Sequence, residues 1–390
     1  MDCDRYFRLW ADIDLDAVRE NIQNIQANLK PGVKSCAVIK ADAYGHGAVE
    51  VAHAIDDIVD FYAVATIDEA MELRGNGLTK PILILGYVHP SMYEIAVKND
   101  IRLPVFDHET AVEISEAAAR AGKDARVHIK IDTGMSRIGF RPSAESVKCV
   151  QKINNLSGIK IEGIFTHFAN SDDKTADKAM KQLDIFKSFI AELEANGLNI
   201  PVKHCANSAA ATYLRDADMD MVRLGISIYG LYPSQYIHQI ELKPALSLKS
   251  HVVMVKTIPA GTSVGYGSTW TADKKSVIAT IPVGYADGYF RSLSNKGYVL
   301  INGSRYPVIG RVCMDQIIVD VSENPDVKRG DEVVLIGQSG ELKITTEEIA
   351  DLAGSFNYEF VCGLTRRVAR KYYIDGKLTG IRDEFEYHFH

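Results

Sequence analysis

The stretch SCAVIK, residues 35–40, is the first of a series of short apolar runs that decide the fold. Each run has the length of a strand, and segments between several of them repeat apolar residues with the i, i+3, i+4, i+7 spacing of a helix. Eight runs follow one another: SCAVIK (35–40), FYAVAT (61–66), PILILG (81–86), RLPVFD (102–107), ARVHIKID (125–132), IEGIFTHF (161–168), VKHCAN (202–207) and MVRLG (221–225). Eight strands that alternate with helices predict an α/β fold, an N-terminal (β/α)8 TIM-type barrel. An open doubly wound sheet is the alternative.

After about residue 240 the pattern changes to closely spaced strand-like runs punctuated by Gly, Asn, Asp and Pro. Only TTEEIADLAG, residues 345–354, reads as a helix there. We therefore predict two domains, a barrel over residues 1–240 and a mostly-β C-terminal domain over residues 241–390. The first residues contain the strand-like LWADIDL, so residues 1–14 are candidates for pairing with the C-terminal domain.

The composition excludes several function classes. The 390 residues carry 44 Lys and Arg against 51 Asp and Glu, a net charge of −7, which disfavours nucleic-acid binding. The six cysteines form no CxxC pair and no zinc-like spacing, so we predict reduced thiols and no metal site. No apolar run approaches the roughly 18 residues of a membrane span, and the acidic N-terminus is unlike a signal peptide. The expectation is a cytoplasmic protein that acts on small molecules, without a membrane partner.

Unusual residues stand at or just after the ends of the predicted strands, where a barrel of this type carries its active site. They are Lys40, Arg137, His167, His204, Asn207, Ser208, Arg223, Gly225 and Ile226. The loops after the last two strands often bind phosphate, and in a closed barrel the first strand is their neighbour. A lysine beside a phosphate site suggests pyridoxal phosphate held as a Schiff base. Each residue also has a structural interpretation: Lys40 as a solvated strand end, Ser208 as a helix cap, the arginines as ion-pair partners.

Several segments resemble the bacterial alanine racemases, enzymes built of a barrel and a C-terminal β domain. The matching segments span residues 37–368: AVIKADAYGHG, HIKIDTGMSRIGF, IEGIFTHFANSDD, HCANSAA, VRLGISIYGLYP, VGYGSTW, IPVGYADGY, GRVCMDQ and NYEFVCGLTRRV. The resemblance implies interconversion of L-alanine and D-alanine with pyridoxal 5'-phosphate, which supplies D-alanine for cell-wall peptidoglycan. It also implies a homodimer with shared active sites.

The resemblance implies two catalytic bases, Lys40 on one face of the substrate and Tyr266 of the other subunit on the opposite face. The residues implied to bind the cofactor are Lys40, Tyr44, His167, His204, Ser208, Arg223, Gly225, Ile226 and Tyr358. Both bases need a lowered pKa, and the positive charge and hydrogen bonds that Tyr266 requires for this are expected from Arg137 and His167.

Further implied roles concern the substrate and its access. Arg137 and the backbone N–H of Met314 would bind the substrate. The entrance would be lined by Asp172, Tyr285, Arg291 and Arg311. Lys130 stands where some members carry a carbamylated lysine. Alternatives are a serine or broad-spectrum racemase, a barrel-type decarboxylase, and a non-catalytic pyridoxal-phosphate carrier.

Overall fold

The computed structural model describes residues 7–324 and 326–384, and these form two compact units that are treated separately here. The barrel unit comprises Val18–Ala43 and Ala48–Lys243. The β unit comprises the chain up to Ala17, Tyr44–Gly47, and the chain from Pro244 onward.

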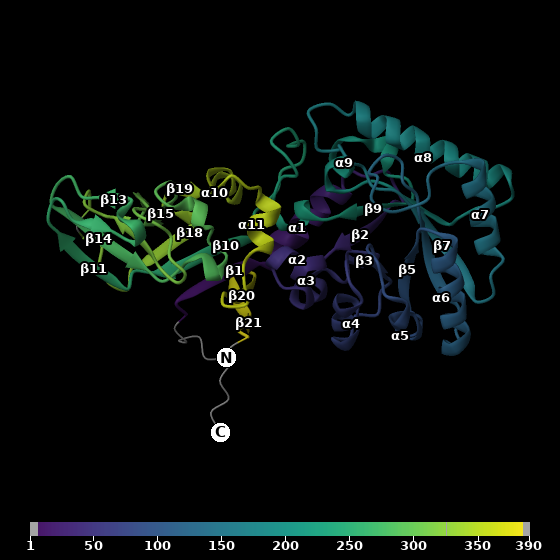
Figure 1. Ribbon diagram of the computed structural model, residues 1–390, viewed down its shortest axis with the longest axis horizontal. Coiled ribbons are helices and arrows are strands. Elements are labelled where there is room, and N and C mark those ends of the chain that lie inside the picture. The colour runs from purple at the N-terminus through teal and green to yellow at the C-terminus, as the bar shows by residue number, and fades with distance from the viewer. Residues whose placement is uncertain (1–6, 325, 385–390) are drawn as a thin grey trace, which may run out of the picture. The chain divides into compact units, whose positions relative to one another are not determined.

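The barrel unit contains eight parallel strands in the order β8-β7-β6-β5-β4-β3-β2-β9 (Figure 1). Their bounds are β2 Lys34–Val38, β3 Phe61–Val64, β4 Ile82–Ile84, β5 Ile101–Val105, β6 Ala125–Lys130, β7 Ile159–Phe165, β8 Val202–His204 and β9 Met221–Leu224. Backbone hydrogen bonds from Asp220 N to Lys203 O and from Arg223 N to Ala206 O, both 3.0 Å, join the two ends of this order. The predicted (β/α)8 barrel is confirmed.

Helices flank the barrel strands (Figure 1). They are α1 Leu15–Gln26, α3 Ala48–Ile55, α4 Ile67–Gly75, α5 Tyr93–Lys98, α6 His108–Ala121, α7 Ala144–Asn154, α8 Asp177–Ala195 and α9 Ser208–Tyr213. Strands β3 and β5 are buried at every position, as expected for parallel strands covered on both faces. Helix α6 shows local agreement of sequence and structure, because Asp107 caps its first turn and Gly122 ends it with a φ of 64°.

The β unit is built mainly on one sheet with the order β16-β15-β18-β10-β1-β20-β21, in which β19 also pairs with β18. Its strands are β1 Leu9–Asp14, β10 Leu246–His251, β15 Tyr298–Ile301, β16 Ser304–Pro307, β18 Glu332–Ser339, β19 Leu342–Ile344, β20 Ala369–Ile374 and β21 Lys377–Arg382. Strand β1 is antiparallel to β10 and parallel to β20. The predicted β-rich character of this region is confirmed.

Two smaller sheets complete the strands described in this unit. One is β11 Met254–Ile258, β14 Ser276–Ile281 and β17 Ile317–Asp320; the other is β12 Ser263–Val264 with β13 Trp270–Thr271. The sequence predicted one helix in this region, and the structure has two: α10 Thr346–Ala353 and α11 Asn357–Cys362. Helix α11 was missed because six residues are too few to show a helical period.

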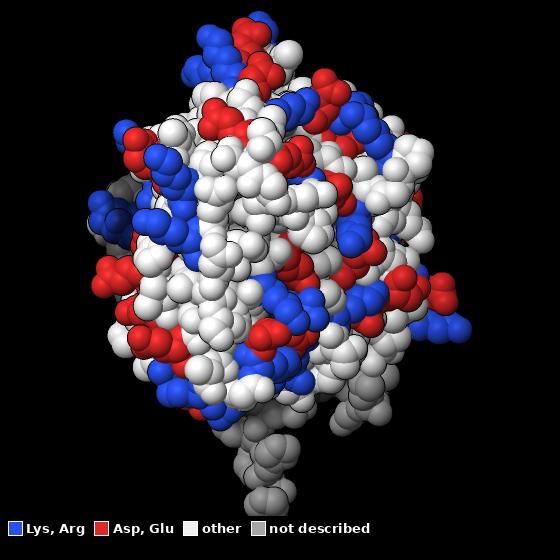
Figure 2. Space-filling model, turned by 90° about the vertical axis from the view of Figure 1, so that its right-hand side faces the viewer, with Lys and Arg blue, Asp and Glu red and all other residues white. Residues whose placement is uncertain are grey.

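The distribution of charged and apolar residues was considered on one face of the molecule and along its helices. On the face drawn in Figure 2, acidic and basic side chains of the described residues alternate without a continuous basic area. Among the residues that the structure describes, no helix is long and apolar enough to span a membrane.

Candidate active site

Polar side chains gather where the parallel barrel strands end. Lys40 comes two residues after β2, Lys130 and His204 are the last residues of β6 and β8, and Arg223 is the third residue of β9. Strands β2 and β9 are paired, with Ala37 opposite Leu224. Because the carboxyl ends of parallel strands meet at one end of a barrel, the fold brings these residues to the same rim.

The segment after β2 has an unusual backbone. Residues Lys40–Gly45 form a single turn, α2, in which Ala41, Asp42, Ala43 and Tyr44 all have φ between 51° and 55°. This is a left-handed helical turn, which costs L-residues about 1–2 kcal/mol each. Such strain persists where the surroundings enforce it, and it is concentrated at functional sites.

Side-chain hydrogen bonds join this turn to helices α4 and α3. A carboxylate oxygen of Glu69 accepts a hydrogen bond from Ala41 N at 2.7 Å, and Asp42 accepts one from Ala48 N at 2.9 Å. Asp42 therefore supports the loop, and the turn presents Lys40 at its first position.

Arg223 is buried, with 3% of its surface exposed. Its guanidinium contacts His204 Nδ1 at 2.9 Å and His167 Nδ1 at 3.2 Å, and it donates to the carbonyl oxygens of Thr166 and Cys205 at 2.9 and 3.1 Å. A guanidinium can only donate, so both Nδ1 atoms accept and carry no proton.

His167 lies among several cations. Burial lowers its pKa to about 3, and the positive charges that add to this shift belong to Arg223, Arg137, Lys130 and Lys40. Burial and these four charges keep His167 neutral near pH 7. Because its Nδ1 accepts from Arg223, the ring carries its proton on Nε2 and can donate a hydrogen bond but brings no positive charge.

Ser208 and the turn after β9 form a small set of donors. The Ser208 hydroxyl oxygen accepts hydrogen bonds from Gly225 N at 2.8 Å and Ser227 N at 3.4 Å. Two accepted bonds leave the hydroxyl proton to be donated. Ile226 begins the buried turn that brings these N–H groups together. The Ser208 hydroxyl proton suits an anionic ligand such as a phosphate ester.

Lys130 is buried and organises the loop that carries Arg137. Its ammonium donates to Ile131 O at 2.7 Å and to Ile138 O at 3.3 Å. Burial and the nearby charges of Arg223 and Arg137 lower its pKa to about 8. Arg137 itself is exposed, at the tip of the loop.

The same loop is folded back by Asp132, which accepts from Gly134 N at 3.0 Å and from Ser136 N at 2.9 Å. Asp172 lies further along the barrel unit on an exposed segment. Its carbonyl oxygen accepts a hydrogen bond from the Ser234 hydroxyl at 2.7 Å.

Two predicted phosphate ligands come together in the β unit. The rings of Tyr44 and Tyr358 lie 6.1 Å apart between centroids. Burial, together with the neighbouring Cys362, raises the pKa of the Tyr44 phenol, so that it remains a hydrogen-bond donor near neutral pH. Gly45 next to it has no room for a side chain, because an added Cβ would lie 2.2 Å from Val361 O.

Tyr266 occupies the tip of the β12–β13 connection, between Gly265 and Gly267 with φ of 71° and 73°. It is 71% exposed in the single chain. Tyr266 lines a pocket of about 340 Å³ together with the predicted entrance residues Tyr285, Arg291 and Arg311. Val312 and Cys313 complete its lining. Met314, half exposed, follows directly in the chain, and its carbonyl accepts from Ala286 N at 3.0 Å.

Comparison with known proteins gives one consistent result. Residues 13–233 match the N-terminal domain of alanine racemase, and residues 245–372 match its C-terminal domain. The chain belongs to the alanine racemase family. The resemblance found in the sequence is thereby confirmed, and so is the enzyme class that it implied, an amino-acid isomerase.

Individual alanine racemases align over nearly their whole length. The alanine racemase of Halothermothrix orenii is 48% identical over 365 residues, which is 93% of this chain and 96% of the relative. That of Methanococcus maripaludis is 46% identical, over 93% of this chain and 98% of the relative.

Solved structures agree. An alanine racemase of Clostridium difficile superposes with a TM-score of 0.93 at 44% identity, covering 97% of this chain and 99% of the other. The Bacillus anthracis enzyme with bound L-Ala-P superposes with a TM-score of 0.92 at 35% identity, covering 98% and 99%. The alanine racemase family uses pyridoxal 5'-phosphate, and the anion-binding donors around Ser208 and the buried Arg223 fit such a group.

Three residues beside the alanine racemase site were not singled out from the sequence: Arg102, His128 and Glu162. His204 Nε2 lies 2.9 Å from His128 Nδ1, and His128 Nε2 lies 3.3 Å from a Glu162 oxygen. The available signal was Gly163, because a glycine inside a strand indicates a bulge or a close approach.

Proposed function

We propose that the chain interconverts L-alanine and D-alanine with pyridoxal 5'-phosphate, as a cytoplasmic homodimer that supplies D-alanine for peptidoglycan. Two domain matches that together cover most of the chain support the activity. The observation that carries the site assignment is that Lys40, Lys130 and Arg223 stand at the carboxyl ends of strands β2, β6 and β9. Cations at one rim of a barrel suit a cofactor with an anionic phosphate and a substrate with a carboxylate.

The residues present can hold this cofactor. Lys40 is the attachment residue, and the phosphate ligands are Tyr44, Ser208, Gly225, Ile226 and Tyr358. Arg223, which is held by His204 and His167, would face the ring of the cofactor. When bound, pyridoxal phosphate withdraws electrons from the substrate α-carbon and makes its proton acidic.

Racemisation requires a proton to leave one face of the α-carbon and another to arrive on the opposite face. One rigid base cannot serve both faces, so we assign Lys40 Nζ to one face and the partner subunit's Tyr266 hydroxyl to the other. Their reference pKa values, about 10.4 and about 10, must both fall for this work. Arg137 supplies positive charge, since His167 is neutral.

Substrate orientation falls to Arg137 and Met314. A guanidinium binds a carboxylate through two parallel hydrogen bonds, and an N–H from Met314 adds a third donor. The aromatic and arginine side chains of Tyr285, Arg291 and Arg311, with Asp172, control access in this proposal. A small pocket closed by Tyr358, Tyr266 and Tyr285 would favour alanine over larger amino acids.

The direct test is an assay of the purified enzyme with L-alanine, L-serine and L-lysine, following formation of the D-isomer. We expect the highest kcat/KM for L-alanine and weak activity on L-serine, because an apolar pocket rejects an added hydroxyl poorly. Higher activity on L-lysine would show a broad-spectrum racemase instead. Lys40→Ala should lose both activity and the visible absorbance of the bound cofactor, and normal absorbance in that variant would contradict the assignment.

We further propose that Lys130 is carbamylated. A pKa of about 8 leaves an appreciable fraction of neutral amine at pH 7–8. The Nζ lone pair forms an N–C bond with CO2 and one proton is released, which gives an anionic partner for Arg137. Carbon-13 NMR in labelled bicarbonate should show a carbamate signal that is absent from Lys130→Ala. Identical spectra from the two proteins would refute the modification.

A further inference from the structure

The strongest unexplained feature of the barrel unit is the buried charge of Arg223. Each of its hydrogen bonds that the structure describes goes to a histidine nitrogen or to a backbone carbonyl, and none to a carboxylate. A buried charge without an opposite charge is costly. The question is therefore which groups hold this guanidinium in place.

The histidine contacts of Arg223 lead to a carboxylate. His204 accepts from Arg223 at Nδ1, and its Nε2 lies 2.9 Å from His128 Nδ1. His128 Nε2 in turn lies 3.3 Å from Glu162 Oε2. Both imidazoles are completely buried. We call the series Arg223, His204, His128 and Glu162 the histidine relay.

The direction of this relay follows from its two ends. Arg223 can only donate, so His204 Nδ1 accepts and the His204 proton sits on Nε2. That proton is donated to His128 Nδ1, which leaves the His128 proton on Nε2, facing Glu162. A carboxylate can only accept. Every hydrogen bond therefore points from the guanidinium toward Glu162.

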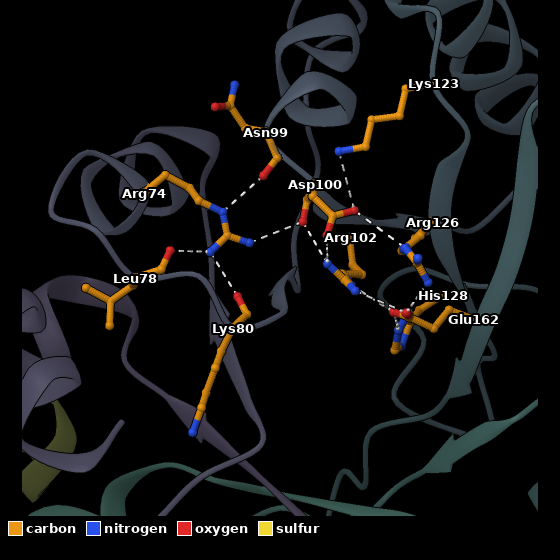
Figure 3. A network of polar contacts seen from close by, with 10 residues as sticks. All are labelled: Arg74, Leu78, Lys80, Asn99, Asp100, Arg102, Lys123, Arg126, His128 and Glu162. Carbon is orange, nitrogen blue, oxygen red and sulfur yellow. Dashed lines mark hydrogen bonds and ion pairs between the residues drawn. The ribbon is translucent and has the colours of Figure 1, made fainter. Parts of the chain in front are cut away.

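Glu162 is held as a carboxylate by cations on its other side (Figure 3). Arg102 makes a fork, with Nε to Oε2 at 2.8 Å and a second nitrogen to Oε1 at 3.1 Å, and Arg126 adds a contact of 3.1 Å. Burial alone would raise the pKa of Glu162, but hydrogen bonds from His128 and Arg102 hold it well below its usual range.

Burial and the neighbouring arginines keep both imidazoles of the relay neutral. Burial is the main cause of the lowered pKa of His128, where Glu162 opposes it and Arg102 and Arg223 add to it. Burial likewise lowers the pKa of His204, and Arg223 acts in the same direction.

The backbone of β7 is shaped for this contact. Val127 pairs with Ile161 and the next residue, His128, pairs with Gly163, so Glu162 is an extra residue in a β-bulge. A bulge re-aims a side chain. Gly163 makes room for the imidazole, because a Cβ there would lie 2.4 Å from His128 Nδ1.

We propose that Glu162 positions Arg223 through His128 and His204, whose protons it holds on Nε2. Loss of the acceptor at Glu162 frees His128 to carry its proton on Nδ1. That proton then faces the Nε2 proton of His204, and the conflict is passed on to Arg223. The inference rests on the proposed function only in naming pyridoxal phosphate as the group that Arg223 faces.

The first test uses the wild-type holoenzyme with nitrogen-15 labelled histidine. Proton–nitrogen correlation spectra should show both buried rings neutral, each with a proton on Nε2, and unchanged from about pH 6 to about pH 8. A doubly protonated ring, or a proton on Nδ1 of either residue, would overturn the proposal.

The second test separates the relay from fold stability. Glu162→Met alone leaves Arg102 without its fork, so the double variant Arg102→Met/Glu162→Met removes both partners together, which proteins often tolerate. The matched control is Arg126→Met, which removes an ion pair to the same carboxylate and leaves the relay intact. Each protein is stripped of cofactor and titrated with pyridoxal phosphate.

The double variant should lose or shift at least one of the two imidazole N–H signals and bind pyridoxal phosphate about tenfold more weakly. The control should keep both signals and bind within about twofold of wild type. Unchanged signals and affinity in the double variant would refute the relay. Absence of alanine racemisation by the wild type would sink the proposed function and leave the imidazole measurement untouched, because that measurement reads the protein's own protons.

Discussion

At the scale of single residues, the site is notable for neutral imidazoles held among cations. His128, His167 and His204 all have lowered pKa values, with burial as the first cause and Arg223 among the charges that add to it. Neutral rings accept hydrogen bonds from Arg223, which a protonated ring could not do at the same nitrogen. The arrangement makes folding sensitive to mild acid.

We predict that the free energy of unfolding falls as the pH drops below about 6.5, where histidines of the unfolded chain take up protons that the folded rings exclude. The contribution of His167 is fully present above about pH 6.5 and is lost progressively toward pH 3, where its folded pKa lies. Each ring adds a slope of about 1.4 kcal/mol per pH unit. Urea unfolding between pH 7.5 and pH 5 measures the slope before most carboxylates titrate. His167→Asn should make it shallower, and an equal slope would contradict the assignment.

A second prediction concerns Gly163. An added Cβ would lie 2.4 Å from His128 Nδ1, so Gly163→Ala must displace the imidazole or the strand. We expect a loss of about 1–3 kcal/mol in unfolding free energy and a changed His128 signal in the NMR spectrum. Gly75→Ala is the matched control, since its added Cβ meets nothing within 4 Å in helix α4. The control should be neutral or stabilising; a similar loss in both variants would argue against a specific clash.

What the sequence predicts at this scale depends on whether a residue ends a strand or interrupts one. Lys40 was predictable because it closes an apolar run, and Arg223 because the last short run carries it near its end; such positions meet at one end of a barrel. Glu162 was not, because simple alternation along IEGIF does not reveal a bulge, and the bulge decides where its carboxylate points. The neutrality of His167 also depends on charges from distant segments, which no local pattern contains.

At the scale of elements, the left-handed turn α2 is the main departure from regular structure. Four successive residues with positive φ are Ala41, Asp42, Ala43 and Tyr44. The sequence pattern predicts a loop after a strand, and its alanine and aspartate residues do not predict a left-handed helix. The turn is imposed by hydrogen bonds from outside it, such as that between Ala41 N and Glu69.

This geometry predicts an inverted response to glycine. Ala41 is exposed and has a φ of 51°, so Ala41→Gly removes a steric penalty and should raise the unfolding free energy by up to about 1 kcal/mol. The exposed Ala119 lies in the right-handed helix α6, and Ala119→Gly should lower it by about 1 kcal/mol. Chemical denaturation of both variants measures the contrast. A loss at both positions would show that the strain at Ala41 is not released.

At the scale of the whole molecule, the candidate residues are divided between the two compact units. Lys40 and Arg223 belong to the barrel unit, whereas Tyr266 and Tyr358 belong to the β unit. Tyr266 is 71% exposed in the single chain, which is unusual for a proposed proton-transfer group. A second copy of the chain would resolve this, because a two-fold dimer can exchange one residue reciprocally between two sites.

The dimer makes a quantitative prediction. Lys40→Ala and Tyr266→Phe subunits are each expected to be inactive alone. If each site takes its lysine from one subunit and its tyrosine from the other, a hybrid dimer contains one intact site and one doubly defective site. Random mixing yields hybrids in half of the dimers, so about a quarter of wild-type activity should return after joint refolding or co-expression. Different affinity tags on the two variants allow the doubly tagged dimers to be isolated, and their yield measures the efficiency of exchange. No recovery, with exchange demonstrated by that yield, would show that Lys40 and Tyr266 act within the same subunit, because a hybrid would then hold two defective sites.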